Sequence, residues 1–321
     1  MFAALALLGC DNEPTPSAPT DLEAIGFGTV DTRATLTDLQ DNGFGVWAFI
    51  NNATVTNYTL MENQRVEYEN GSWEYSPLQY WLDNTVFSFI AVYPQGAYSY
   101  NEENKAIELS VSDTPSEIDY LMATNTTDTS VEGYSTTVDL QFKHMLTSVG
   151  LNIWRDGGKH QNDQMRIKEV TLGNIIKSGV YSSATESWTN NNNDKLTLEK
   201  VYENFSDTDN IGAVIVKDDG TLDPGGSEAA NPFGEMMLLP QTLDADNSVS
   251  LKIVYELKRQ NAADWEEAEL ETVLPSITWK AGQRYTYNVV LSSVTDITVY
   301  YIQTKVDPWG TPQVGGTVII K

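Results

Sequence analysis

The side chains of this sequence that could carry chemistry are few, apart from its carboxylates. The 321 residues include one cysteine, Cys10, two histidines, His144 and His160, and 45 aspartates and glutamates. A single cysteine forms no internal disulfide, and without a Cys-x-x-Cys pair or a Cys/His cluster we expect no zinc site. A glycosidase needs two carboxylates at about 5 to 9 Å with tuned pKa values, and among so many acidic residues the presence of a pair is uninformative.

Other motifs of catalysis and cofactor binding are missing as well. The chain has no Gly-x-Ser-x-Gly nucleophile elbow and no Gly-x-x-x-x-Gly-Lys phosphate loop. The segments beginning at Asp207 and Asp244 (Asp-Thr-Asp-Asn and Asp-Ala-Asp-Asn) resemble fragments of calcium loops, but each lacks the central glycine and the terminal glutamate, so we interpret them as polar turns. We therefore predict that the chain is not an enzyme and that it needs neither a metal nor another cofactor.

His144 falls on the apolar side of an alternating stretch. Between 138 and 146 the even-numbered residues are valine, leucine, phenylalanine, histidine and leucine, whereas positions 139, 141 and 143 are polar. This period of two predicts a half-buried strand with His144 facing the core. A general base or a ligand is the functional interpretation, but no partner group is in view, so we favour a core histidine bonded to backbone or hydroxyl groups. His160, in the polar segment 157–163, is expected to face water.

Cys10 follows an apolar run in the first eleven residues, MFAALALLGCD. The run is about half of the ~20 residues that a membrane-spanning helix needs, and it ends at a small residue, which is the pattern of a secretory signal. The segment Leu7-Leu8-Gly9-Cys10 resembles a bacterial lipobox, in which the thiol is acylated and becomes the first residue of the mature chain. Acyl chains hold a soluble domain to a bilayer with ~0.8 kcal/mol per buried CH₂. We predict a lipoprotein signal at 1–9 and lipidation at Cys10; an incidental cysteine is the alternative.

Arg33 ends the segment that follows. Residues 11–20 read DNEPTPSAPT, a polar and proline-rich composition typical of an extended tether, which we place at 10–21. Residues 22–33 predict a short strand followed by a polar stretch. Arg33 is the only basic residue before Arg65, and it lies in the kind of exposed loop that proteases cut. From composition alone, an ordinary surface arginine is the preferred interpretation.

The overall composition limits the classes of partner. Nineteen basic and 45 acidic residues give a net charge of −26, which argues against nucleic acid and against a peripheral hold on anionic lipid. High negative charge keeps a surface-exposed protein soluble. The length fits two domains of ~150 residues, with a boundary in the glycine-rich segment 157–163.

Short strands are the elements that must position these residues. Apolar or alternating runs predict strands at 44–50, 86–93, 106–111, 138–146, 167–172, 236–240, 249–257, 269–274, 285–291, 297–302 and 314–320. Asn70-Gly71 predicts a hairpin turn. The segment 196–205 has weak helical spacing and 266–271 has helical propensity, although the alternation next to it favours a strand. Many short strands without a long amphipathic helix predict an all-β protein of sandwich or barrel domains.

Three tryptophans lie near predicted turns. Trp73, Trp188 and Trp265 would stack on sugar rings if they were exposed. Core packing is the usual explanation for an aromatic residue in a strand, and we prefer it.

The order of several short motifs resembles the fimbrillin family, the pilus-building lipoproteins of Bacteroidota. The motifs are Phe142-x-His144-x-Leu146, the strand ending at Tyr93-Pro94, Leu239-Pro240-Gln241, Trp279-x-Ala281-Gly282-x-x-Tyr285-x-Tyr287, and Trp309. The resemblance implies two transthyretin-like β-sandwich domains in tandem, at 22–157 and 158–321, after the signal and the tether.

The resemblance also implies a sequence of processing steps. The chain would be exported, acylated at Cys10, moved to the outer surface and cut after Arg33, so that Ala34 becomes the new N-terminus. The cut would remove the strand at 22–30 and leave a hydrophobic groove for a neighbour's C-terminal strand. Strand addition draws affinity from main-chain hydrogen bonds and register from alternate side chains. The candidate donor residues are Thr317, Val318, Ile319 and Ile320.

Two functions of different classes follow from these expectations. The first is a structural and adhesive subunit of a fimbrium, with other pilin subunits as partners and a lipid anchor in the outer membrane. The alternative is a surface lipoprotein that does not polymerise and binds host glycans or proteins. The tail bears on this choice, because Gly315-Gly316 would fit a turn before a last strand within the same domain.

Overall fold

A computed structural model describes residues 23–29, 36–158, 162–203, 211–217, 221–291, 300–309 and 317–318. Within these ranges the chain is almost entirely β-structure, which confirms the predicted fold class. The two helices are short: α1 (Leu36–Asn42) and the 3₁₀ turn η1 (Gln95–Ala97). Several residues singled out in the sequence lie outside the described residues: Cys10, Arg33, Ala34, His160, Asp207, Ile319 and Ile320.

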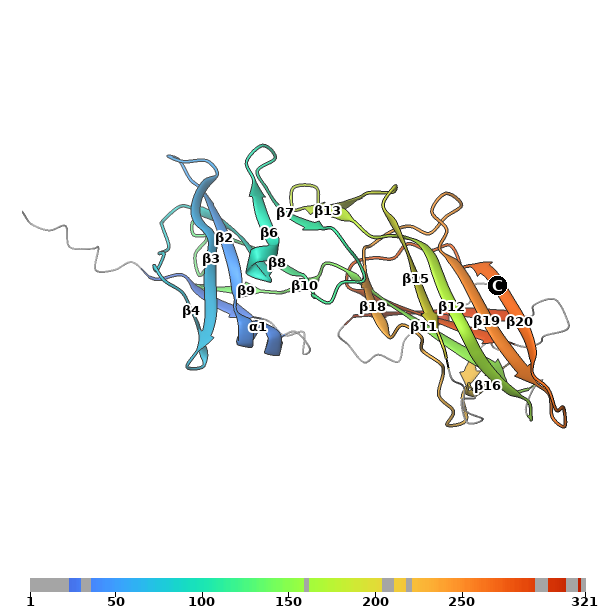
Figure 1. Cartoon of the computed structure of the whole chain (residues 1–321). Helices are drawn as coiled ribbons and strands as arrows, with labels where there is room; N and C mark the ends of the chain where they lie inside the picture. The colour runs from blue at the N-terminus through green and yellow to red at the C-terminus, as the bar shows by residue number, and fades with distance from the viewer. Residues whose placement is uncertain are drawn as a thin grey trace, which may run out of the picture.

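The N-terminal lobe is built on a six-stranded sheet covered by a two-stranded one (Figure 1). The larger sheet has the order β10 (Lys143–His144), β8 (Leu121–Asp128), β5 (Val86–Tyr93), β2 (Phe44–Asn51), β3 (Tyr58–Glu69) and β4 (Ser72–Glu74). The smaller sheet pairs β1 (Gly26–Thr29) with β9 (Thr137–Leu140). One core cluster joins buried side chains of β1, β2, β5 and β9.

The C-terminal lobe consists of a seven-stranded sheet and a four-stranded sheet. The first runs β17 (Leu222–Asp223), β16 (Ala213–Val216), β11 (Thr147–Asp156), β21 (Gln283–Leu291), β22 (Tyr300–Pro308) and β23 (Thr317–Val318), and β18 (Glu235–Leu238) also pairs with β11. The second runs β15 (Lys195–Val201), β12 (Gln164–Ile176), β19 (Ser250–Lys258) and β20 (Glu266–Val273). Their inner side chains form one shared core, because each strand alternates buried and outward residues.

A second four-stranded sheet connects the two lobes. Its order is β14 (Ser187–Asn190), β13 (Gly179–Ser182), β7 (Ala106–Val111) and β6 (Tyr98–Asn101), so β7 of the first half pairs with β13 of the second. A separate apolar cluster packs around this junction. The indole of Trp188 donates a hydrogen bond to the Met145 carbonyl across it, at 3.1 Å. The two lobes are therefore joined by a ladder and a core as well as by the chain.

Several local expectations are confirmed. Asn70 and Gly71 both have positive φ, 51° and 90°, and form the turn between β3 and β4. Strand β5 ends at Tyr93, one residue before Pro94, as predicted. In β19 the residues that were predicted to alternate are buried on one side, and the segment at Asp244 is a polar turn in which its carboxylate accepts from the Asp246 and Asn247 amides at 2.9 Å.

The weak helical spacing at 196–205 is wrong for the residues described there, because 195–201 form strand β15, which is held by its ladder with β12. The strand favoured at 269–274 over the helical propensity of 266–271 is confirmed as β20, which pairs with β19. The stretch 138–146 has the predicted parity but breaks at 141–142 into β9 and β10, which join different sheets. The predicted boundary at 157 follows β11, whose partners β16, β18 and β21 all come later in the chain. A domain boundary placed before β11 would keep this strand with its partners. The two-domain organisation itself stays a prediction.

Candidate functional site

Strand β1 and the residue before it contribute two side chains to the core of the N-terminal lobe. Ile25 just before the strand and Phe27 within it are 1% and 7% exposed, and glycines 26 and 28 occupy the opposite face. The strand runs parallel to β9, from Gly26 opposite Thr137 to Thr29 opposite Leu140. The glycines permit a close approach here, since a Cβ on Gly28 would lie 3.1 Å from an Asp139 carboxylate oxygen.

The β1-binding surface consists of strand β9 and the aromatic rings of Phe44, Tyr75 and Phe89. The Phe27 ring meets these three rings edge-on, with centroids 6.4, 5.4 and 6.0 Å away. Edge-to-face contacts of this kind add ~0.5–1.5 kcal/mol per pair beyond simple burial. An apolar side chain of this strand is therefore strongly favoured at the Phe27 position.

Hydrogen bonds fix the β1 backbone at its N-terminal end. The Ile25 amide donates to the Gln79 carbonyl at 2.9 Å, and the Trp81 amide donates to the Glu23 carbonyl at 3.0 Å. The Tyr75 hydroxyl donates to the Ile25 carbonyl at 2.9 Å. Burial raises the pKa of the Tyr75 hydroxyl above its ordinary value, so this group remains a donor. Among the described residues β9 is the only ladder partner of β1, and the other edge of this segment has only the isolated antiparallel bridge of Ala24 with Tyr80.

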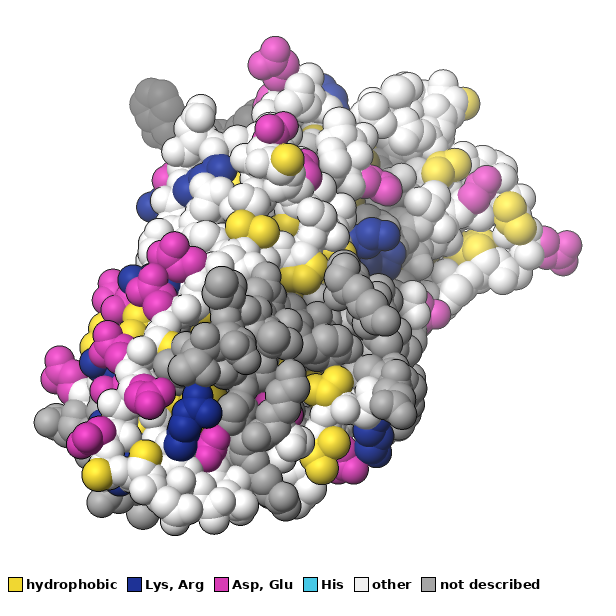
Figure 2. All heavy atoms as spheres, turned by 90° about the vertical axis from the view of Figure 1, so that its right-hand side faces the viewer, with side chains coloured by type: hydrophobic (Ala, Val, Ile, Leu, Met, Phe, Trp, Pro, Cys, Tyr) yellow, Lys and Arg dark blue, Asp and Glu magenta, His cyan; other side chains and the backbone are white. Residues whose placement is uncertain are grey.

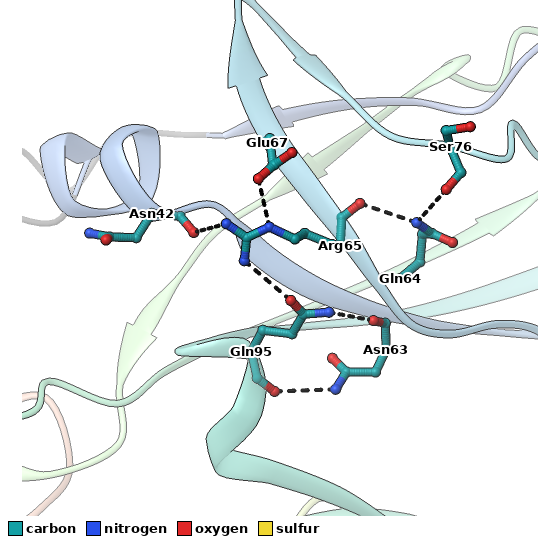
Figure 3. A network of polar contacts seen from close by, with 7 residues as sticks. All are labelled: Asn42, Asn63, Gln64, Arg65, Glu67, Ser76 and Gln95. Carbon is teal, nitrogen blue, oxygen red and sulfur yellow. Dashed lines mark hydrogen bonds and ion pairs between the residues drawn. The ribbon is translucent and has the colours of Figure 1, made fainter.

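Helix α1 follows Arg33 and Ala34 in the sequence, and hydrogen bonds to residues outside β1 hold its end. Leu39 is 2% exposed within the core of the lobe. The Arg65 guanidinium donates to the Asn42 carbonyl at the helix end, at 2.9 Å, and also contacts Glu67 and Gln95 at 2.7 and 3.3 Å (Figure 3). Gln95 and Asn63 exchange side-chain to backbone hydrogen bonds of 2.7 and 3.2 Å. Residues 30–35 therefore connect two elements, β1 and α1, that have different hydrogen-bond partners.

The described part of the candidate donor segment pairs within its own chain. Thr317 and Val318 form β23, opposite Lys305 and Thr304 of β22. This pairing belongs to the C-terminal lobe, whereas the β1-binding surface belongs to the N-terminal lobe (Figure 1). The structure therefore does not bring the candidate donor and β1 together within one chain.

His144 is a buried residue, as predicted, but the predicted type of partner is wrong. Its Nδ1 lies 2.9 Å from a carboxylate oxygen of Asp119, rather than near a backbone or hydroxyl group. The ladder of β10 with β8 places His144 opposite Leu121, two residues from Asp119. The imidazole also stacks on Trp309, with centroids 4.2 Å apart and planes 13° apart. Both partners are distant in sequence, so the local alternation carried no signal of them.

The three tryptophans that were weighed as sugar contacts are half-buried and have structural partners. Trp73 packs on Phe44 with centroids 4.8 Å apart. Trp188 bonds to the Met145 carbonyl across the junction of the lobes. Trp265 lies under the Arg166 guanidinium, 4.1 Å from the ring centroid. Core and surface packing therefore accounts for all three.

The outer face of the four-stranded sheet in the C-terminal lobe carries cross-strand ion pairs. Arg166 and Glu256 are 2.6 Å apart, Lys252 and Glu269 are 3.1 Å apart, and Lys168 pairs with Glu267. Figure 2 shows acidic side chains interspersed with lysine and arginine on the end of this lobe, with hydrophobic side chains only scattered among them. The exposed Lys252–Glu269 and Lys168–Glu267 pairs contribute ~0–1 kcal/mol each, whereas the side chains of Arg166 and Glu256 are only 17% and 16% exposed.

The described ranges contain neither a metal-binding cluster nor a membrane-spanning helix. No group of three His, Cys, Asp or Glu side chains there could hold a metal ion. No helix in the same ranges is both long and apolar enough to cross a membrane.

These features define an all-β protein whose N-terminal strand is held by an aromatic core. The chain belongs to the fimbrillin-like family, whose sequence profile matches residues 32–309, and the predicted resemblance is confirmed. It is similar to a fimbrial protein from Bacteroides vulgatus, with 16% identity, 90% of this chain and 100% of that chain covered, and a TM-score of 0.64. It is also similar to a candidate cell adhesion protein from Parabacteroides distasonis, with 12% identity, 91% and 100% covered, and a TM-score of 0.52. These identities show a shared fold. A sequence search of curated proteins finds no match.

Proposed function

We propose that this protein is a structural and adhesive subunit of a cell-surface pilus that assembles by strand exchange. In this proposal the chain is exported to the outer membrane, held there by acyl groups on Cys10, and cut after Arg33. A neighbouring subunit's C-terminal segment, with Thr317, Val318, Ile319 and Ile320, then replaces β1. Membership of the fimbrillin-like family supports this function, as do the fimbrial and cell adhesion descriptions of its structural neighbours.

The observation that carries the proposal is the way β1 is held. Strand β1, which has one ladder partner, and the residue before it contribute two buried side chains, Phe27 and Ile25, to a core otherwise built from later segments. Helix α1, on the other side of Arg33, has its own anchor through Arg65. Cleavage between them would cut the covalent link to β1 and leave the hydrogen bonds of α1 in place, while departure of β1 would uncover the core that Ile25 and Phe27 fill.

The C-terminal sequence fits the vacated positions in one register. Val318 and Ile320 share a parity, so they would take the places of Ile25 and Phe27. In that register Lys321 replaces Gly28, next to the Asp139 carboxylate, and gains a cross-strand pair of opposite charge. Val318, Ile320 and Lys321 are then placed favourably, whereas Ile319 takes the position of Gly26 beside Thr137 on the opposite face.

An Arg-specific protease tests this function on the purified full chain. Limited digestion should cut after Arg33 and yield ladders in unheated SDS gels and filaments in electron micrographs. The matched control is Arg33→Lys, which keeps the charge, removes the cleavage site and should stay monomeric. Deleting residues 317–321 should permit the cut but prevent ladders. Protein that is cleaved cleanly, keeps its C-terminus and remains monomeric would refute the polymerising function.

The pairing of β23 with β22 favours one alternative. If the tail remains in its own sheet, the chain would be a surface lipoprotein that binds host glycans or proteins without polymerising, with Cys10 as a lasting anchor. Mass spectrometry of the mature N-terminus on cells separates the two functions. An acylated Cys10 alone supports this alternative, whereas a free Ala34 supports the pilus subunit.

A further inference from the structure

A cleft lies where the two lobes meet, away from the β1-binding surface. Its volume is about 410 Å³, and its walls come from β10, the β13–β14 hairpin, the segment before β21 and the end of β22. The residues that define this junction cleft are Lys143, His144, Tyr181, Glu186, Gln283 and Trp309. A neighbouring hollow of about 170 Å³ shares Lys143, Tyr181 and Glu186 with it. Small-molecule sites typically measure ~300–1,000 Å³ and occur preferentially at such junctions.

Polar groups in the junction cleft have unused hydrogen-bonding capacity. Lys143 and Glu186 are exposed, and neither forms an ion pair within the part of the chain that the structure describes. The Nε2 atom of His144 is buried and has no hydrogen-bond partner among the same residues. Its Nδ1 is held by Asp119, so the imidazole cannot rotate to satisfy Nε2 without breaking that contact. A buried polar atom without a partner is costly, but Nε2 is closed to solvent, so the groups that the cleft offers to a ligand are the exposed Lys143 and Glu186.

The aromatic walls of the cleft are held rigidly. Tyr181 belongs to β13, which pairs with both β7 and β14. The Trp188 ring packs against the Tyr181 ring, with centroids 5.8 Å apart. The Trp309 ring stacks on His144, and its amide donates to the Gly282 carbonyl at 2.9 Å. Both rings are half-buried, so each offers the cleft part of its apolar surface. Fixed aromatic surface with a few placed polar groups is typical of a ligand site.

The mixture of groups favours a neutral ligand rich in hydroxyls. One ammonium, one carboxylate and one side-chain amide include both donors and acceptors, and a hydroxyl can serve either kind. The net charge of −26 disfavours an anionic ligand. A sugar ring offers hydroxyls at its edge and apolar C–H groups on its faces, which match the polar groups and the two aromatic rings. We propose that the junction cleft binds a neutral saccharide unit, independently of strand exchange.

Ligand-observed NMR on the uncleaved full chain tests this proposal. The probes are galactose, glucose, N-acetylglucosamine and lactose, with the zwitterion alanine as a comparison of different chemistry. At least one sugar should bind with a Kd of about 1 mM or below. Glu186→Gln and Lys143→Met should each weaken that binding about fivefold or more, because each removes a charge-assisted hydrogen bond.

Matched controls separate a site from an indirect effect. Glu132→Gln and Lys200→Met change exposed residues that line neither hollow, and both should bind the sugar like the parent. Thermal unfolding of all four variants should match the parent, because the replaced side chains are exposed. Three results would overturn the proposal: no sugar binds at about 50 mM, the cleft variants bind as well as the controls, or alanine alone binds.

Discussion

Replacing Phe27 with alanine tests whether β1 is held mainly by its side chains. Phenylalanine to alanine changes in a core cost ~3–5 kcal/mol. Phe27 is 7% exposed and meets three rings, but its strand has a ladder on one side only and can shift to fill part of the space. We therefore expect a loss of about 3 kcal/mol in the free energy of unfolding of the uncleaved chain. Urea denaturation followed by tryptophan fluorescence measures it.

The control for Phe27→Ala lies on the opposite face of the same strand. A Cβ on Gly26 would lie 3.6 Å from the Thr137 hydroxyl, an ordinary contact, so Gly26→Ala should change the stability by less than about 1 kcal/mol. After cleavage and assembly, Phe27 leaves with β1, and Phe27→Ala polymers should be as stable as the parent's. A loss below about 1 kcal/mol in the uncleaved chain, or an equal loss in the polymer, would refute the reasoning.

Three further outcomes are expected. Arg65→Ala should lower the free energy of unfolding by about 1–2 kcal/mol and speed amide hydrogen exchange in α1, because the Asn42 carbonyl loses its donor. The amides of α1 should exchange more slowly in Arg65→Lys than in Arg65→Ala, and equal exchange rates in the two variants would contradict this. Burial raises the pKa of Tyr287 above its ordinary value of 10.0, so the stability that this residue contributes is complete below pH 10 and falls as the pH rises further. Above pH 10 the melting temperature of Tyr287→Phe should therefore fall less steeply with pH than that of the parent. Parallel plots of melting temperature against pH for the two proteins would contradict this. Ile320→Ser should weaken the SDS-resistant ladders and leave urea unfolding of the uncleaved chain unchanged; undiminished ladders would remove Ile320 from the donor strand.

Local periodicity predicted several strands that bury one face, although strands such as β8 and β11 were not predicted. The alternation at 249–257 corresponds to β19, and the pair Asn70-Gly71 gives the turn between β3 and β4. These features depend on neighbouring residues and on backbone φ preferences, so the sequence contains them directly. The motifs that resembled the fimbrillin family fall within the matched residues 32–309.

Features that depend on distant partners could not be predicted in this way. Strand β15 alternates only from Lys195 to Glu199, too short a stretch to outweigh its helical spacing, and the ladder with β12 decides its conformation. The pairing of β7 with β13 crosses the two halves and has no local signature. The carboxylate next to His144 lies 25 residues away along the chain, and the stacked Trp309 belongs to the other end of the protein. The junction cleft follows from such contacts, so only the folded chain reveals it.

Side-chain burial alone would not favour strand exchange in the proposed register. Ile25 and Phe27 bury at least as much apolar surface as Val318 and Ile320 would, and Phe27 adds aromatic contacts that Ile320 cannot replace. In the uncut chain, β1 also has the advantage of an intramolecular strand, whose effective concentration is in the millimolar range or above. A cut after Arg33 removes that advantage, and β1 then binds as a separate peptide that dilution carries away. The donor stays covalently attached to a folded subunit, with Lys321 placed next to Asp139. Cleavage would therefore act by changing chain connectivity, so adding the 1–33 peptide in excess should slow assembly, and an unchanged rate would contradict this account.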